Sequence, residues 1–364
     1  MTQIAQSAIT ILVFILLLGG LVLIHELGHF ITARLARVKV LEFAIGFPPR
    51  AKVLKQGGET LYTLNWLPIG GFVKLEGEDG DDGADPRSFV NQRLWIRVGI
   101  LLAGVTMNLL LSFVIFTGIA MTGEPAIGVT FGEVSPGSPA AAIGLSAGDT
   151  LVSVNGKRYS AFDQHVPSED LRALAGQQVT IGIVHADGTE QEYQVTLRVP
   201  ASPNEGALGI GKLTGTQAGT INYSLLEAVG IGIQRTRDAF GMILAGLGDL
   251  GRSIVTNPTT APPASGPVGI AVQLGDVLWS LGPLYVLYMA GLLSANLALV
   301  NVLPFPPLDG GRIFVILLKA IPGIGKRISV RAEQLTYAVG FVALFGFLIW
   351  ITVFDVARQL GGGN

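Results

Sequence analysis

The sequence predicts an α-helical membrane protein with about four transmembrane helices, an inserted α+β domain and a β-hairpin. The 364-residue chain has a mean hydropathy of +0.54 and only 14% charged residues, whereas soluble domains carry about 25%. A hydrocarbon core of roughly 30 Å needs about 20 apolar residues, and four stretches provide them: 8–33, 94–122, 281–305 and 335–356. The net charge of −2 argues against a nucleic-acid partner.

The first apolar stretch predicts a retained span. No Lys or Arg precedes Arg34, and no small-residue cleavage site follows the apolar run, so the pattern of a cleaved signal peptide is missing. The chain contains no cysteine, which excludes disulfides and thiolate metal sites and leaves the compartment open.

The spans divide the chain into segments with different expected structures. The expected segments are 1–33 as the first span, 34–93 as a loop with a β-hairpin, 94–122 as the second span, 123–205 as the inserted domain, 206–280 as a linker, 281–310 as the third span, 311–334 as a loop, 335–356 as the fourth span and 357–364 as a tail.

Basic residues predict the orientation of these segments. Two loops are rich in them, with Arg34, Arg37, Lys39, Arg50, Lys52, Lys55, Lys74, Arg87 and Arg93 in one, and Arg312, Lys319, Lys326, Arg327 and Arg331 in the other. Because cytoplasmic loops carry the excess of Lys and Arg, we expect 34–93 and 311–334 in the cytoplasm, and both termini and 123–280 outside.

A further helix is expected over residues 224–247, within the linker. It carries four charged side chains, Glu227, Arg235, Arg237 and Asp238, and its pattern is typical of an amphipathic helix at the membrane surface. The alternative is a fifth span, which would invert the topology downstream.

The end of the first span carries the strongest chemical signal. His25 and His29 are four residues apart, hence neighbours on one helical face, and Glu26 follows the first histidine. This H-E-x-x-H pattern is typical of a zinc site in which the glutamate takes a proton from the attacking water. The alternative is a polar helix end at the interface, but titratable groups in a bilayer are costly and hence a functional hypothesis by default.

A hydrolytic zinc site usually has three protein ligands. A third histidine six residues after His29 is ruled out, because Leu35 stands there, and His165 and His185 lie in the inserted domain, where we expect surface or core side chains. Asp309 is the best candidate, since "NVLPFPPLDGG" breaks the helix with three prolines and irregular backbone at membrane depth is tolerated where it lines a cavity. Weaker candidates are Asp249, Asp276 and Asp355.

These motifs resemble the site-2 protease family of intramembrane zinc metalloproteases, and most of all its bacterial branch that cleaves anti-sigma factors. The matching segments are "HELGH", "NVLPFPPLDGG", "SANLALVN", "SGPVGIA" and "PIGGFVKLEGE". The resemblance implies one Zn²⁺ held by His25, His29 and Asp309, with Glu26 as the base. It also implies a place in the bacterial inner membrane and roles for Asn296 and Asn301 in substrate binding or oxyanion support.

The sequence departs from the family pattern at two places. The family's A-G-P-x-x-N reads "AGVTMN", with Val105 in place of proline, and Asn108, the third expected substrate-binding residue, remains. The family's G-F-G reads "GFPP", with Pro48 in place of the second glycine, which affects a local turn and not the chemistry.

The inserted region looks like one PDZ domain of the permuted bacterial protease kind. The segment 126–200 predicts a strand, a short Ala-rich helix, a Gly-Asp turn, an Asn-Gly hairpin, a second helix and two alternating strands. PDZ domains bind extended peptides by strand addition, so a peptide ligand is expected here. The alternative is an α+β spacer without a ligand.

The loop hairpin spans residues 40–75, with its turn around Gly57 and Gly58. The resemblance implies that it associates with the membrane and pairs with an unwound substrate. The expected substrate is a single-span membrane protein already trimmed by a site-1 protease. The acidic run 76–85 is expected to be a solvated loop.

Two other functions compete with a protease. A non-enzymatic membrane scaffold would recruit partners through the PDZ domain, but it would not require Glu26 beside two metal ligands. A metal transporter would need a second set of polar spans, which the sequence lacks.

Overall fold

The computed structural model describes residues 2–78, 85–163, 166–200, 205–257, 261–323 and 328–361. They divide into two compact units, 1–117 with 230–364, and 118–229. His165, most of the acidic run 76–85, and Lys326 and Arg327 of the second basic loop lie outside the described residues.

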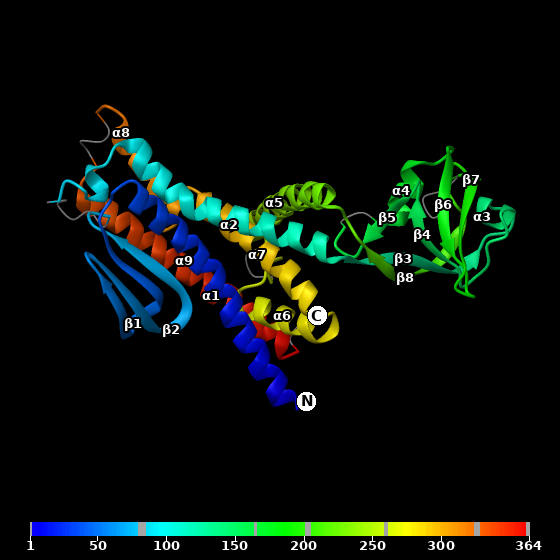
Figure 1. Ribbon diagram of the computed structural model, residues 1–364, viewed down its shortest axis with the longest axis horizontal. Coiled ribbons are helices and arrows are strands. Elements are labelled where there is room, and N and C mark those ends of the chain that lie inside the picture. Colours follow the sequence, from blue (N-terminus) through cyan, green and yellow to red (C-terminus); the bar gives the residue numbers. More distant parts are fainter. Residues whose placement is uncertain are drawn as a thin grey trace. The chain divides into compact units, whose positions relative to one another are not determined.

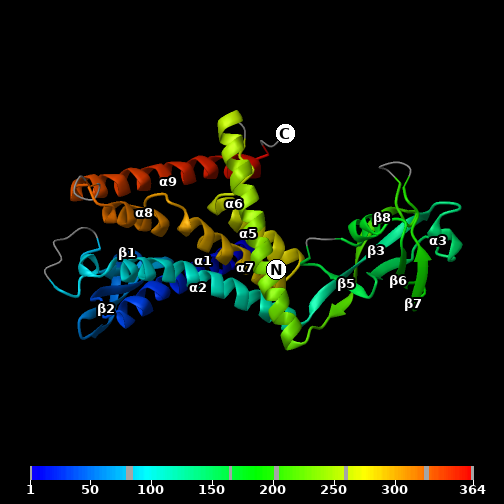
Figure 2. The same cartoon turned by 90° about the horizontal axis from the view of Figure 1, so that it is seen from above.

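The larger unit contains the long helices, and we call it the membrane unit. Its elements, two of which continue into the other unit, are α1 (Gln3–Leu35), β1 (Val40–Gly57), β2 (Thr60–Leu75), a 3₁₀ turn (Phe89–Asn91), α2 (Leu94–Thr122), α5 (Leu225–Thr256), α6 (Pro267–Ser280), α7 (Pro283–Val302), α8 (Asp309–Ala320) and α9 (Val330–Gln359). Figure 1 and Figure 2 show these helices around α7.

Among the described residues, five helices are long and apolar enough to cross a membrane: α1, α2, α5, α7 and α9. Helices α1, α2 and α9 contain the predicted spans 8–33, 94–122 and 335–356, and α2 has the predicted bounds, whereas α7 lies within the predicted span 281–305. The fifth, α5, covers the helix that the sequence places at the membrane surface.

Two elements refine the predicted segments. The predicted third span begins at Leu281, but the helical structure is interrupted there between α6 and α7. Gly282 lies at this interruption and has a φ of +96°, a value that favours glycine. Helix α6 has 14 residues, about 21 Å at 1.5 Å per residue, too short to span. Helix α8 occupies the first part, residues 311–320, of what the sequence predicts as the second basic loop.

Helices α1 and α2 pack closely where α1 carries a glycine. A Cβ atom at Gly28 would lie 2.4 Å from the carbonyl oxygen of Ala103, so only glycine permits this approach. Small residues commonly let membrane helices approach in this way. The contact brings α2 against the face of α1 that carries His25 and His29.

Strands β1 and β2 confirm the predicted hairpin. The turn follows Gly57, and Gly58 has a φ of +67°. Phe43 of β1 lies opposite both Tyr62 and Val73 of β2, so the first half of β1 lies between the two halves of β2. Residues 71–75 therefore form one margin of the sheet, and β2 packs against α1 (Figures 1 and 2).

The smaller unit, which we call the inserted unit, is built on one six-stranded sheet in the order β7-β6-β4-β5-β3-β8. Its elements are β3 (Glu124–Val134), α3 (Pro139–Ala142), β4 (Thr150–Val154), β5 (Lys157–Ser160), α4 (Pro167–Ala173), β6 (Gln178–Val184), β7 (Glu190–Thr196) and β8 (Ile210–Ile221). The largest side chains of its core, Phe131 and Tyr159, are fully buried.

Strand β8 corrects the predicted boundary of the inserted domain. The sequence places residues 206–280 in a linker, but β8 pairs with β3 from Glu124↔Ile221 to Val134↔Ile210. Most β8 side chains are exposed, and the strand contains Gly211, Gly215 and Gly219. Backbone pairing at the sheet edge, rather than burial of apolar side chains, therefore holds this strand, and hydropathy gives no sign of it.

Candidate metal centre

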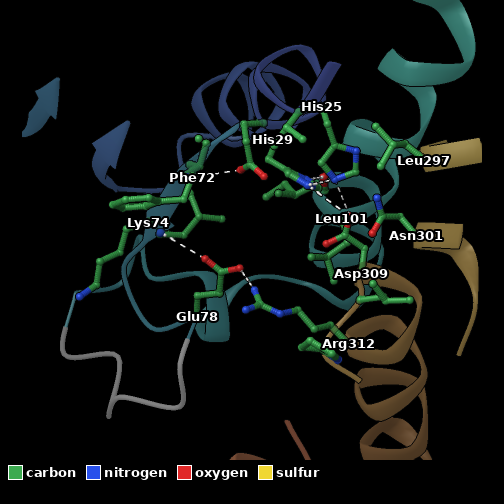
Figure 3. Close-up of a pocket in the computed structure, with 18 of the residues that line it drawn as sticks. His25, His29, Phe72, Lys74, Glu78, Leu101, Leu297, Asn301, Asp309 and Arg312 are labelled. Atoms are coloured by element: carbon green, nitrogen blue, oxygen red, sulfur yellow. Dashed lines mark hydrogen bonds and ion pairs between the residues drawn. The ribbon is translucent and has the colours of Figure 1, made fainter. Parts of the chain in front are cut away.

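Three side chains from the two ends of the chain converge in the membrane unit. The imidazole Nε2 of His25 and the carboxylate Oδ2 of Asp309 lie 2.9 Å apart, and the Nε2 of His29 and the same oxygen lie 3.3 Å apart. The two Nε2 atoms are separated by 3.1 Å. Figure 3 shows the three side chains pointing toward one another. The sequence-predicted metal ligands are thus brought together.

The local sequence explains how Asp309 reaches α1. Helix α7 ends at Val302, and the proline-rich segment 303–308 returns the chain to begin α8 at Asp309. A Cβ at Gly310 would lie 2.1 Å from the carbonyl oxygen of Val302, so the return requires glycine there. The predicted break in the helix is confirmed.

The three donors fit a zinc ion. They offer two imidazole nitrogens and one carboxylate oxygen, all within 4.8 Å of one another, and this is a donor set that Zn²⁺ takes at about 2.0–2.2 Å. Tetrahedral bonds of that length place ligand atoms about 3.3 Å apart, close to the three separations observed.

Helix α2 leaves space for such an ion. A Cβ at Gly104 would lie 2.5 Å from the Nε2 of His29 and 2.7 Å from the Nε2 of His25. Any larger residue at position 104 would fill the space onto which both nitrogens face. A glycine in the middle of a helix costs stability, so its presence at this contact agrees with a need for room.

Glu26 lies beside the cluster without belonging to it. Its carboxylate Oε2 accepts a hydrogen bond of 3.1 Å from the backbone N–H of Val73 in β2. Glu26 lines the same cavity as the three metal-ligand candidates. Its carboxylate is therefore held by the sheet and remains outside the donor set.

A cavity of about 680 Å³ contains these groups. It is lined by α1, α2, the margin 71–75 of β2, the segment before α8, and α7. Asn301 and Asn108 line it, whereas Asn296 does not. Five residues of a helix turn by about 140° from one another, so Asn296 and Asn301 point to different sides of α7.

An ion pair forms part of the cavity lining. Glu78, just after β2, contacts Arg312 of α8, and both residues line the cavity (Figure 3). Arg312 follows Asp309 by one helical turn, so the pair ties the sheet to the helix that supplies the third donor. Sequence reasoning missed this pair, because nothing in the two segments indicates that they lie side by side.

The weaker acidic candidates lie elsewhere. Asp355 is 2% exposed and accepts a 2.8 Å hydrogen bond from the backbone N–H of Gly269 at the start of α6, whereas Asp249 and Asp276 are exposed. His185 of the inserted unit contacts Tyr193 and Asp149. None of these residues belongs to the described metal cluster.

Two histidines and a carboxylate that meet among membrane-spanning helices are the donor set expected of a membrane-embedded metalloprotease. Residues 13–347 match peptidase family M50, and this chain belongs to that family. It is 34% identical over 356 residues to a provisionally named zinc metalloprotease of Clostridium acetobutylicum, covering 98% of this chain and 99% of that protein. A provisionally named zinc metalloprotease of Clostridium perfringens is 33% identical over 94% of this chain and 97% of its own length.

The zinc metalloprotease RasP of Geobacillus kaustophilus is 29% identical over 430 residues, 96% of this chain and 98% of that protein. The chain is accordingly a zinc metalloprotease, and the predicted enzyme class is confirmed. The role of each predicted site residue stays a prediction.

Proposed function

We propose that this protease hydrolyses peptide bonds within or near the transmembrane segment of single-span membrane proteins. The observation that supports the proposal most is the common cavity. It joins Glu26, the candidate ligands and an edge strand of the sheet. A protease of folded soluble proteins would have no need for an active site on membrane helices.

The chain's own residues support the chemistry of hydrolysis. Zinc, when bound by His25, His29 and Asp309, polarises a scissile carbonyl and makes water more acidic. Glu26 accepts the proton of the attacking water and returns it to the amine leaving group. The hydrogen bond from Val73 fixes its carboxylate beside the donor set.

The margin of β2 supports binding of an extended substrate. A helix hides its amide carbonyls in its own hydrogen bonds, so a substrate span has to unwind before cleavage. Residues 71–75 line the cavity consecutively, and an extended peptide can add to a strand at the edge of a sheet. Asn301 lines the same cavity and is the predicted polar contact to the substrate.

Several observations favour a surface position for α5. Figure 2 shows α5 running across the direction of α1, α2 and α9. Arg237, Asp249 and Arg252 are largely exposed, which is costly for a side chain that faces lipid. Apolar side chains such as Leu226 and Ile233 are exposed as well, as expected of a helix with one face in the membrane interface.

The Glu78–Arg312 pair supports the same topology. It joins the two basic loops, so an even number of crossings must separate them. Helices α2 and α7 supply two crossings, and α5 as a span would make three. We therefore propose four spans, with both basic loops in the cytoplasm of a bacterial cell and both termini outside its inner membrane.

The inserted unit is proposed to be a PDZ domain that binds a peptide and screens substrates. Strand β8 pairs with β3 on one side and, within the described sheet, with no strand on the other. A peptide can add there. Substrates would be anti-sigma factors or signal-peptide remnants, trimmed first by a site-1 protease.

Cleavage of a panel of single-span peptides by the purified protein, with and without a chelator, tests the proposal. We expect chelator-sensitive cleavage inside the span, and the same loss in His25→Ala. If the zinc-loaded protein cleaves no span, the competing function gains support, a PDZ-bearing membrane scaffold in which zinc has a structural role.

A further inference from the structure

Helix α2 presents three positions to the candidate metal centre at four-residue intervals. They are Ile100, Gly104 and Asn108, which lie on one face of the helix because four residues make little more than one turn. Gly104 leaves room between the two histidines. The other two positions face the imidazole nitrogens on the side away from Asp309.

His29 has a definite partner on this face. Its Nδ1 lies 2.8 Å from the backbone carbonyl oxygen of Ile100. A carbonyl can only accept, so Nδ1 carries the proton and donates it. The lone pair of His29 is then on Nε2, the atom that faces His25 and Asp309.

His25 also faces α2, at the side chain of Asn108. The Nδ1 of His25 lies 3.4 Å from the amide Nδ2 of Asn108. Asn108 is fully buried, and its Oδ1 makes no hydrogen bond within the described structure. The hydroxyl of Ser294 on α7 donates to the backbone carbonyl of Asn108 at 2.7 Å, which holds this turn of α2 in place.

We propose that Asn108 is a positioning residue for His25, and not a substrate contact. When Nε2 of His25 binds zinc, its Nδ1 must carry a proton and needs an acceptor. A half-turn of the Asn108 amide places its oxygen opposite Nδ1 and uses the acceptor that has no other partner. Each histidine then donates to an oxygen of α2. The inference rests on the proposed zinc site.

The test compares zinc affinities of purified variants in detergent, by competition with a chromophoric chelator. Removing an outer partner of a metal-binding histidine typically weakens binding about 10–100-fold, and we expect this loss for Asn108→Leu. Asn108→Asp keeps an acceptor oxygen in either protonation state, so we expect the affinity of the parent protein or better. The visible spectrum of the Co²⁺-loaded protein should change in Asn108→Leu and be restored in Asn108→Asp.

Ser112→Ala is the matched control. Ser112 lies one turn further along α2, is fully buried, and its hydroxyl also makes no hydrogen bond within the described structure. It does not line the cavity. We expect the parent zinc affinity and Co²⁺ spectrum, because the lost hydroxyl is not bonded to a ligand.

Two results would overturn the proposal. One is parent affinity and an unchanged spectrum in folded Asn108→Leu. The other is a loss of zinc affinity of tenfold or more in Asn108→Asp, which would assign the role to the amide NH₂ group. If Asn108→Leu does not fold, Asn108→Asp alone decides the test. A parent protein without zinc affinity would instead overturn the zinc site itself.

Discussion

The backbone N–H of Val73 donates a hydrogen bond to the carboxylate of Glu26. The bond joins the edge strand of the sheet to the residue next to the first metal-ligand candidate. The group that we assign as the base and the strand that we assign to the substrate are therefore parts of one arrangement. A shift of the strand would move the carboxylate with it.

Substitution of Glu26 by Gln tests its role as the base. The amide keeps the size of the side chain and removes the basic oxygen, so we expect zinc to stay bound. Turnover should fall by about 10²–10⁴-fold, the usual contribution of general acid–base catalysis. The measurement is cleavage of a membrane-span substrate at equal zinc content. Glu59→Gln, at the exposed hairpin turn, is the matched control and should cleave at the rate of the parent. Equal cleavage rates in the two variants would exclude Glu26 as the base.

Removal of Asp309 tests the third donor. Asp309→Ala should bind zinc more weakly than the parent by more than the roughly 10–100-fold lost with an outer-shell partner, because a direct ligand is gone. Titration with a competing chelator measures this. The exposed Asp249 of α5 provides the control, Asp249→Ala, in which affinity should not change. An Asp309→Ala protein with undiminished affinity would remove this residue from the site.

A methyl group at position 104 should exclude the metal. In Gly104→Ala the new Cβ would stand within 2.7 Å of both Nε2 atoms, so we expect at least a tenfold loss of zinc affinity, about 1.4 kcal/mol. Gly99→Ala is matched to it, because Gly99 lies on the same helix and a Cβ there would meet no atom within 4 Å. Zinc-content analysis of both variants gives the answer, and equal content would show that the space at Gly104 serves only packing.

Single cysteines test the topology, since the chain has none of its own. An impermeant thiol reagent added to intact cells should label neither Lys55→Cys nor Arg331→Cys, and both should react after permeabilisation. Labelling of Arg331→Cys alone would show that an odd number of crossings separates the two loops, and hence that α5 spans. Labelling of Lys55→Cys from outside would reverse the whole orientation.

Removal of the inserted sheet tests its regulatory role. Glu124 and Ile221 are partners at the ends of β3 and β8, so their Cα atoms lie about 5 Å apart and a short Gly-Ser linker can replace residues 124–221. The zinc affinity should be retained, short pre-trimmed substrates should be cleaved, and longer ones should be admitted. Loss of all cleavage with zinc bound would make the inserted unit part of the catalytic machinery.

The correct sequence predictions rest on side-chain chemistry and hydropathy. The bounds of α2, the hairpin turn at Gly58, and the meeting of His25 and His29 with Asp309 follow from apolar run length, turn residues and motif spacing. Each of these features depends on which residue types occur at particular positions.

The remaining features depend on backbone groups or on distant contacts. The carbonyl of Ile100 and the N–H of Val73 hold His29 and Glu26, and a backbone group is the same in every residue except proline. The four-residue spacing of Ile100, Gly104 and Asn108 can be read from the sequence. Their position beside the candidate metal centre depends on how α2 packs on α1. Strand β8 is held by backbone pairing, which leaves no alternation to detect.

The donors of the metal cluster are separated by 284 positions in the chain. A ribosome that adds about 5–20 residues per second needs roughly 15–60 s to pass from His25 to Asp309. Throughout that interval the growing chain has two histidines and no carboxylate to complete the set. A newly made molecule therefore cannot complete its candidate metal centre until Asp309 has been synthesised, after α1, α2, α5 and α7.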